Sequence, residues 1–136
     1  MSEAVQKNRR RFGVMTFADI AHYRLPLPAY ISILHRISGA MMFFLLPFVL
    51  YLLDLSLTSE LSFENLKSFT SHWFVKLLIL GLVWAYLHHL TAGVRHFMMD
   101  MHMGLDKNTI NKTSIIILCV SLPLTLLVAL KLFGAF

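Results

Sequence analysis

Three long apolar runs constrain this chain more than any other feature of its sequence. They cover about residues 29–53, 73–99 and 114–133. Each run reaches the roughly 20 residues that an α-helix needs to cross the hydrocarbon core of a bilayer. Because that core offers no hydrogen-bond partner to open backbone groups, the runs must be helices. The sequence therefore predicts an all-α membrane protein, with three transmembrane helices in residues 29–136 and an N-terminal arm in residues 1–28.

The composition agrees with a membrane protein and argues against two other classes. Only 14% of the residues are charged, whereas a soluble domain carries about 25%. The first apolar run starts too late and is too long to be the apolar part of a cleaved signal peptide. The aromatic residues lie in the apolar runs and do not interleave with the basic ones, so a nucleic-acid partner is not expected. The expected surroundings are membrane lipid.

The distribution of charge predicts an orientation. The arm and the second connector carry an excess of Lys and Arg, whereas the first connector is mostly acidic. Because cytoplasmic segments carry the positive excess, we expect the N-terminus and the second connector on the cytoplasmic side. The basic residues behind this expectation are Lys7, Arg9, Arg10, Arg11, Arg24, Lys107 and Lys112.

A first polar cluster opens the first apolar run. Ionisable residues inside a membrane are costly and usually serve a function. Spacings of three and four place Ser32 on the same helical face as His35 and Arg36. Arg36 lies near the N-terminus of its predicted helix, where the helix dipole disfavours a cation. An anion or a polarised oxygen nearby would relieve that conflict.

A second polar cluster lies near the end of the second run. His89, Gly93 and His96 share one helical face, and Gly93 leaves space beside His89 for a flat ligand or a close helix. If the antiparallel helices place Arg36 and Arg95 at similar depth, His89 lies about 9 Å deeper. A deep imidazole with space beside it suits an axial haem ligand. A guanidinium nearer the surface suits the haem propionates.

The residues alone leave alternatives open. His88 is adjacent to His89 and has Ala92 as its own small neighbour, and helical periodicity favours His89 only slightly. In a haem-free membrane scaffold or transporter subunit, the same histidines would serve as interhelical hydrogen-bond donors or proton relays. Arg36 would then extend to lipid phosphates.

The two clusters together resemble a known family. Ser32 to Ser38 read Ser-x-x-His-Arg-x-Ser, and His89 to His96 read His-x-x-x-Gly-x-Arg-His, followed by Asp100. In this order, in a three-span chain, they resemble the cytochrome b subunit of succinate dehydrogenase, the larger membrane anchor of respiratory complex II. The likeness covers about residues 20–105. The chain departs from the family pattern at Phe12, where a proline is common, and at His102, where a small residue is usual.

The resemblance implies a role for each matched residue. His89 would be one axial ligand of a b-type haem, which selects it over His88. His35 and Arg36 would hold the haem propionates, and Ser32 and Arg36 would line the ubiquinone pocket. The remaining matched residues are expected as neighbours of the haem or the quinone, namely Arg95, His96 and Asp100.

The resemblance also implies partners and a place in the cell. A second membrane anchor would supply the other haem ligand, because His35 is expected too near the inner surface. A flavoprotein and an iron–sulfur subunit would deliver electrons from succinate oxidation, since a chain with one cysteine lacks the ligands of a cluster. The expected location is the bacterial or mitochondrial inner membrane. The sequence does not distinguish this direction from that of a fumarate reductase anchor.

Overall fold

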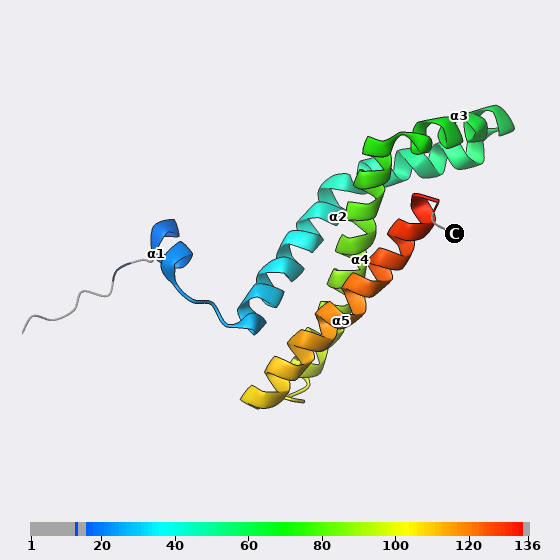
Figure 1. Cartoon of the computed structure of the whole chain (residues 1–136). Helices are drawn as coiled ribbons and strands as arrows, with labels where there is room; N and C mark the ends of the chain where they lie inside the picture. Colours follow the sequence, from blue (N-terminus) through cyan, green and yellow to red (C-terminus); the bar gives the residue numbers. More distant parts are fainter. Residues whose placement is uncertain (1–12, 14–15, 135–136) are drawn as a thin grey trace, which may run out of the picture.

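The chain folds into a helical bundle that α4 holds together. The computed structural model describes residue 13 and residues 16–134, and the elements in that part of the chain are five α-helices. The middle helix α4 packs against both α2 and α5, whereas α1 stands apart from the bundle (Figure 1). The helices are α1 (Phe17–His22), α2 (Leu27–Thr58), α3 (Glu60–Ser71), α4 (Trp73–Asp100) and α5 (Lys107–Leu132).

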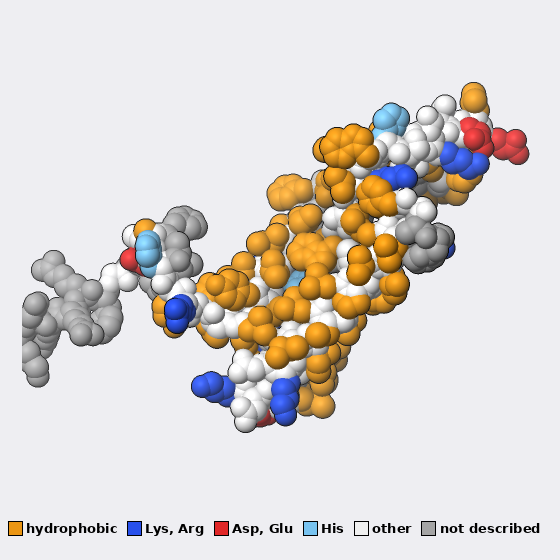
Figure 2. All heavy atoms as spheres, viewed as in Figure 1, with side chains coloured by type: hydrophobic (Ala, Val, Ile, Leu, Met, Phe, Trp, Pro, Cys, Tyr) orange, Lys and Arg blue, Asp and Glu red, His pale blue; other side chains and the backbone are white. Residues whose placement is uncertain are grey.

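The predicted fold class is confirmed. α2, α4 and α5 are long and apolar enough to cross a membrane. The apolar side chains cover the middle of the bundle, and the charged ones gather towards its two ends (Figure 2). Phe43 and Phe44 are 71% and 76% exposed in this chain, as is usual for side chains that face lipid or a partner helix. Of the basic residues used to predict the orientation, Lys7 to Arg11 lie outside the described residues, as does Phe12.

The helices extend beyond the apolar runs that predicted them. α2 begins after Pro26 and carries Pro28 in its first turn, where the missing backbone N–H costs no hydrogen bond. α5 begins about two turns before its apolar run, because Asp106 caps a polar first segment that hydropathy does not detect. The first connector is largely helical, since Ser59 and Ser62 form a reciprocal capping box that starts α3.

The end of α4 explains the departure at His102. The backbone N–H of His102 donates to Met99 O at 2.9 Å, and that of Met103 donates to Met98 O at 3.0 Å. This pair of bonds is a Schellman motif, whose C′ residue adopts a left-handed conformation and is usually glycine. His102 has φ = 61° at that position. A small residue, which the resemblance leads us to expect here, would adopt this conformation more easily, and His102 adopts it with some strain.

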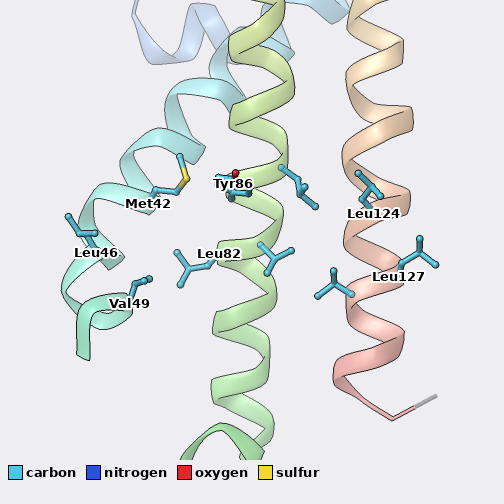
Figure 3. Close-up of a pocket in the computed structure, with 10 residues that line it drawn as sticks. Met42, Leu46, Val49, Leu82, Tyr86, Leu124 and Leu127 are labelled. Carbon is cyan, nitrogen blue, oxygen red and sulfur yellow. The ribbon is translucent and has the colours of Figure 1, made fainter. Parts of the chain in front are cut away.

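The interior of the bundle is small and lies where all three long helices meet. Ile31 from α2, Ala92 from α4 and Ile117 from α5 form its buried apolar cluster. Nearer the N-terminal end of α4, on the side of α3, the three long helices leave an open apolar groove between them (Figure 3). Its lining includes Met42, Leu46, Leu82, Tyr86, Leu124 and Leu127. The tightly packed and the splayed parts of the bundle therefore differ, and the polar clusters belong to the packed part.

Candidate functional site between α2 and α4

Three imidazoles from two helices form one cluster. The ring of His35 on α2 stacks on that of His89 on α4, with a centroid distance of 4.1 Å and an interplanar angle of 16°. The ring of His96 lies 4.9 Å from that of His35 on its other flank. His89 and His96 share a face of α4 because they are seven residues apart, and His35 reaches between them.

The backbone of α2 fixes how the His89 ring is presented. His89 Nδ1 lies 3.1 Å from the carbonyl oxygen of His35. Because a carbonyl only accepts hydrogen bonds, Nδ1 carries the proton and Nε2 keeps its lone pair. Among the described residues, none forms a hydrogen bond with His89 Nε2, and that atom is not among the buried unpaired ones. This is the arrangement of a metal-ligating histidine, whose second nitrogen donates to a backbone carbonyl.

Two glycines let the imidazoles come this close to the opposite helix. A Cβ atom on Gly39 would lie 2.9 Å from His89 Cε1, closer than real contacts of this kind. A Cβ atom on Gly93 would lie 3.6 Å from His35 Nε2, an ordinary contact. The sequence predicted that Gly93 makes room beside His89, but Gly93 lies beside His35, and Gly39 is the glycine against His89. Sequence reasoning missed Gly39, although its place one turn after His35 was a usable signal.

The cluster contains polar atoms without partners. The Nε2 atoms of His35 and His96 are buried and make no hydrogen bond within the described part of the chain. Buried polar atoms are nearly always paired in folded proteins, because an unpaired one keeps its full desolvation cost. A group from outside this chain that accepts hydrogen bonds, such as a carboxylate, would pair with them. The residues present therefore fit a haem, which brings both an iron for His89 and propionates for such donors.

His88, unlike the adjacent His89, is enclosed by its own chain. Its side chain is completely buried in the bundle and stacks against Trp84, with ring centroids 5.5 Å apart. The ring approaches the backbone of Ile31 without a well-formed hydrogen bond. A fully enclosed imidazole leaves no room for a macrocycle. The geometry therefore favours His89 over His88 as an iron ligand.

The structure brings some predicted site residues together and separates others. Ser32 is half-buried and Arg36 is exposed, both within one turn of His35 on α2. Asp100 is exposed at the last residue of α4. Arg95 is 6% exposed, and its Nε donates to Thr113 Oγ1 of α5 at 3.1 Å. Arg95 thus points to α5, whereas the imidazoles face α2.

The expected depth of His35 was wrong by most of a helical turn. If Arg36 and Arg95 lay at the same depth in the antiparallel pair, Met42 would lie opposite His89. Gly39 lies opposite His89 instead. Three residues of helix correspond to about 4.5 Å. The two arginines need not be level, because one is buried against α5 and the other is exposed. His35 consequently reaches the depth of the His89 ring, which the sequence reasoning had excluded.

Comparison with known families supports the interpretation of the two motifs. The model of the family "Succinate dehydrogenase/Fumarate reductase transmembrane subunit" matches residues 7–128, which include both polar clusters. The chain belongs to this family. The matched region also contains all of α1 to α4 and most of α5.

Individual members of the family show how far the likeness extends. A "Succinate dehydrogenase cytochrome b556 subunit" of Paracoccus denitrificans is 31% identical, over 82% of this chain and 85% of its own length. The protein of the same name from Coxiella burnetii is 39% identical over 61% of this chain and 67% of its own. A "Succinate dehydrogenase cytochrome b560 subunit" of Marchantia polymorpha is 33% identical, over 77% and 80%. The chain is thus a membrane anchor of the succinate dehydrogenase cytochrome b type and a multi-pass protein of the inner membrane.

Proposed function

We propose that this chain binds one b-type haem through His89 Nε2 and forms part of a site where ubiquinone is reduced with electrons from succinate. The observation that carries the proposal is the hydrogen bond from His89 Nδ1 to the His35 carbonyl, which directs the lone pair of Nε2 away from α2. When bound, the haem supplies one-electron redox chemistry. The polar groups of the cluster then have partners, which the described chain by itself does not give them.

The second axial ligand comes from another chain. His35 is the nearest candidate here, but its ring lies face to face with that of His89. Because the two rings face each other, His35 would not be positioned to hold the iron together with His89. His35 instead acts with Arg36 on the propionates, through a charge-assisted hydrogen bond from the guanidinium. A second membrane anchor, packed against this face of α2 and α4, supplies the missing histidine.

Ser32 and Arg36 serve the quinone. They are four residues apart on α2, so a carbonyl oxygen between them would meet a hydroxyl donor and a guanidinium. Ser32 donates a hydrogen bond that orients the quinone. Arg36 stabilises the negative charge that develops on the quinone oxygen as electrons arrive. His96 and Asp100 lie further along the same end of α4 and border the haem or quinone.

The soluble partners are an iron–sulfur subunit and a flavoprotein, which dock on the cytoplasmic side. The names of the relatives support a succinate dehydrogenase assembly. The positive charge of the N-terminal arm and of the α4–α5 connector supports their cytoplasmic placement. A fumarate reductase anchor is the second candidate, because the matched family includes such subunits.

Adjacent histidines provide a matched test of the haem ligand. We expect His89→Leu to lose the low-spin b-type spectrum of the purified complex, and His88→Leu to keep it. Reduced-minus-oxidised optical spectra, scaled to protein, measure both. The opposite result would make His88 the ligand. A wild-type complex without haem but with quinone activity would support the haem-free scaffold instead.

A separate variant tests the quinone role. Arg36→Leu should reduce the rate of ubiquinone reduction by succinate at least tenfold, because the developing charge on the quinone loses its cation. Reduction of an artificial dye by the soluble subunits should persist, since the dye does not need the membrane site. Equal loss of both activities would indicate failed assembly rather than a quinone site.

A further inference from the structure

We propose that Ser38 and Gly39 are positioning residues for His89, which set the angle and the donor strength of its imidazole. The proposal rests on the function proposed above, since it concerns how an iron ligand is held. Gly39, which has no side chain, lets the ring approach α2 closely. Ser38 acts on the carbonyl oxygen that receives the His89 N–H. Both residues belong to α2, one turn beyond His35.

A side chain on Gly39 would collide with the His89 ring. A Cβ at this position would lie 2.9 Å from Cε1 and 3.3 Å from Nδ1 of His89. The ring sits at the end of a rotatable side chain, so an added methyl group would displace the ring rather than prevent folding. The displaced ring would strain both its bond to the His35 carbonyl and its stack on the His35 ring. The direction of Nε2 would change with it.

Ser38 shares the acceptor of His89. Its side chain is completely buried, and its Oγ donates to His35 O at 2.8 Å while lying 3.4 Å from His89 Nδ1. A carbonyl that receives a hydroxyl proton is a weaker acceptor for a further donor. The same hydroxyl oxygen can also accept from the His89 N–H, so without it Nδ1 loses one acceptor and faces less competition for the other, and the basicity of the imidazole changes. Because a more basic ligand favours ferric over ferrous iron, a change in basicity shifts the midpoint potential of the haem.

The chain offers a matched control for the glycine. Gly81 is also inside a transmembrane helix, and a Cβ there would lie 3.9 Å from Met41 Cε, an ordinary contact. Gly39→Ala and Gly81→Ala therefore add the same methyl group and the same helix propensity of about 1 kcal/mol. They differ in what the methyl group meets.

The experiment compares three variants in the full membrane complex, purified in mild detergent. Electron paramagnetic resonance of the oxidised haem reports the orientation of its axial imidazoles, and an optical redox titration gives its midpoint potential. We expect Gly39→Ala to shift the low-spin signal or lose haem, and Gly81→Ala to match the wild type. We expect Ser38→Ala to retain haem at a shifted midpoint potential.

The outcomes separate the positioning role from the proposed function. If the wild type holds haem through His89 but Gly39→Ala gives the same spectrum as Gly81→Ala, the role of Gly39 is overturned. If Gly39→Ala yields no assembled complex, Ser38→Ala decides, because an unchanged potential there overturns the proposal. If the wild type binds no haem, or loses it in His88→Leu alone, the proposed function fails first.

Discussion

The two interfaces of α4 differ in how their polar groups are satisfied. Towards α5, Arg95 donates to Thr113, and the buried hydroxyls of Ser114 and Ser121 donate to carbonyls of their own helix at 2.8 Å. Towards α2, the buried Nε2 atoms of His35 and His96 and both ring nitrogens of His88 have no partner within the described chain. Among the described residues, these polar groups of the α4–α5 interface are therefore paired, whereas several imidazole nitrogens at the α2–α4 interface are not.

The difference between the two interfaces helps to separate polar residues that only pack helices together from those that can bind a ligand. Small hydroxyl residues let two helices approach closely and donate their hydrogen bonds to backbone carbonyls of their own helix. They therefore need no partner from a ligand. An imidazole can return one ring nitrogen to a carbonyl of the preceding helical turn, as His22 and His72 do, but its second nitrogen then still needs a partner. A half-buried imidazole with an unpaired nitrogen, as in His35 and His96, is consequently a better indication of a binding site than a buried hydroxyl. The nitrogens of His88 are also unpaired, but its side chain is completely enclosed and leaves no room for a ligand.

Removing Arg95 should weaken the α4–α5 interface and leave haem binding unchanged. Arg95→Ala removes the bond to Thr113 and the packing of a buried side chain. Polar contacts between membrane helices are worth roughly 0.6 kcal/mol and up to about 1.7. We expect a loss of about 1 kcal/mol in the unfolding free energy of the full chain, measured by circular dichroism during titration of mild-detergent micelles with sodium dodecyl sulfate.

Thr113→Val gives the control for that prediction. In a double-mutant cycle, the two substitutions should be non-additive by about 0.6 kcal/mol if the hydrogen bond carries the effect. The haem spectrum of the complex should stay that of the wild type. A lost haem spectrum with unchanged stability would instead return Arg95 to the site, as the family resemblance implied.

The sequence was informative about the fold for a physical reason. Hydrophobic runs of about 20 residues leave a chain in a membrane one choice, so the three spans could be predicted from residue types alone. The helix ends could not, because Asp106 and Ser59 act through capping bonds that hydropathy does not register. The reverse turn at His102 was visible only as a departure from a family pattern, without its backbone cause.

The site was predictable as a set of residues but not as a geometry. Helical periodicity placed His89, Gly93 and His96 on one face, and the structure agrees. The register between α2 and α4 depends on how glycines and rings interlock across the interface, which no single helix contains. That is why Gly39 was missed and why His35 was expected at the wrong depth.

Acid should weaken the α4–α5 interface through the cap of α5. The hydroxyl and backbone N–H of Thr109 both hold the pKa of Asp106 below its usual range. A carboxyl with a lowered pKa adds stability above its unfolded pKa, and that stability is lost as pH falls through the folded value, below about pH 4. Asparagine caps equally well but does not titrate. We therefore expect the wild type to lose stability relative to Asp106→Asn below pH 4, in unfolding measured from pH 7 to pH 3. Parallel profiles would show that the cap carries no charge-dependent stability.

The smallest effect should come from a completely buried hydroxyl of α5. Ser121 is completely buried, and its Oγ donates to Ile117 O of its own helix. That carbonyl also accepts the backbone N–H four residues later, so it stays paired when the hydroxyl is removed. Ser121→Ala removes both the hydroxyl and its desolvation cost, and leaves no unpaired donor behind. We expect a change of less than about 0.5 kcal/mol in the same titration, against the larger loss in Arg95→Ala. A loss as large as that of Arg95→Ala would mean that Ser121 bonds across the interface. In that case burial alone, rather than unpaired nitrogen, would mark the functional polar residues, and the contrast between the two interfaces would no longer identify the site.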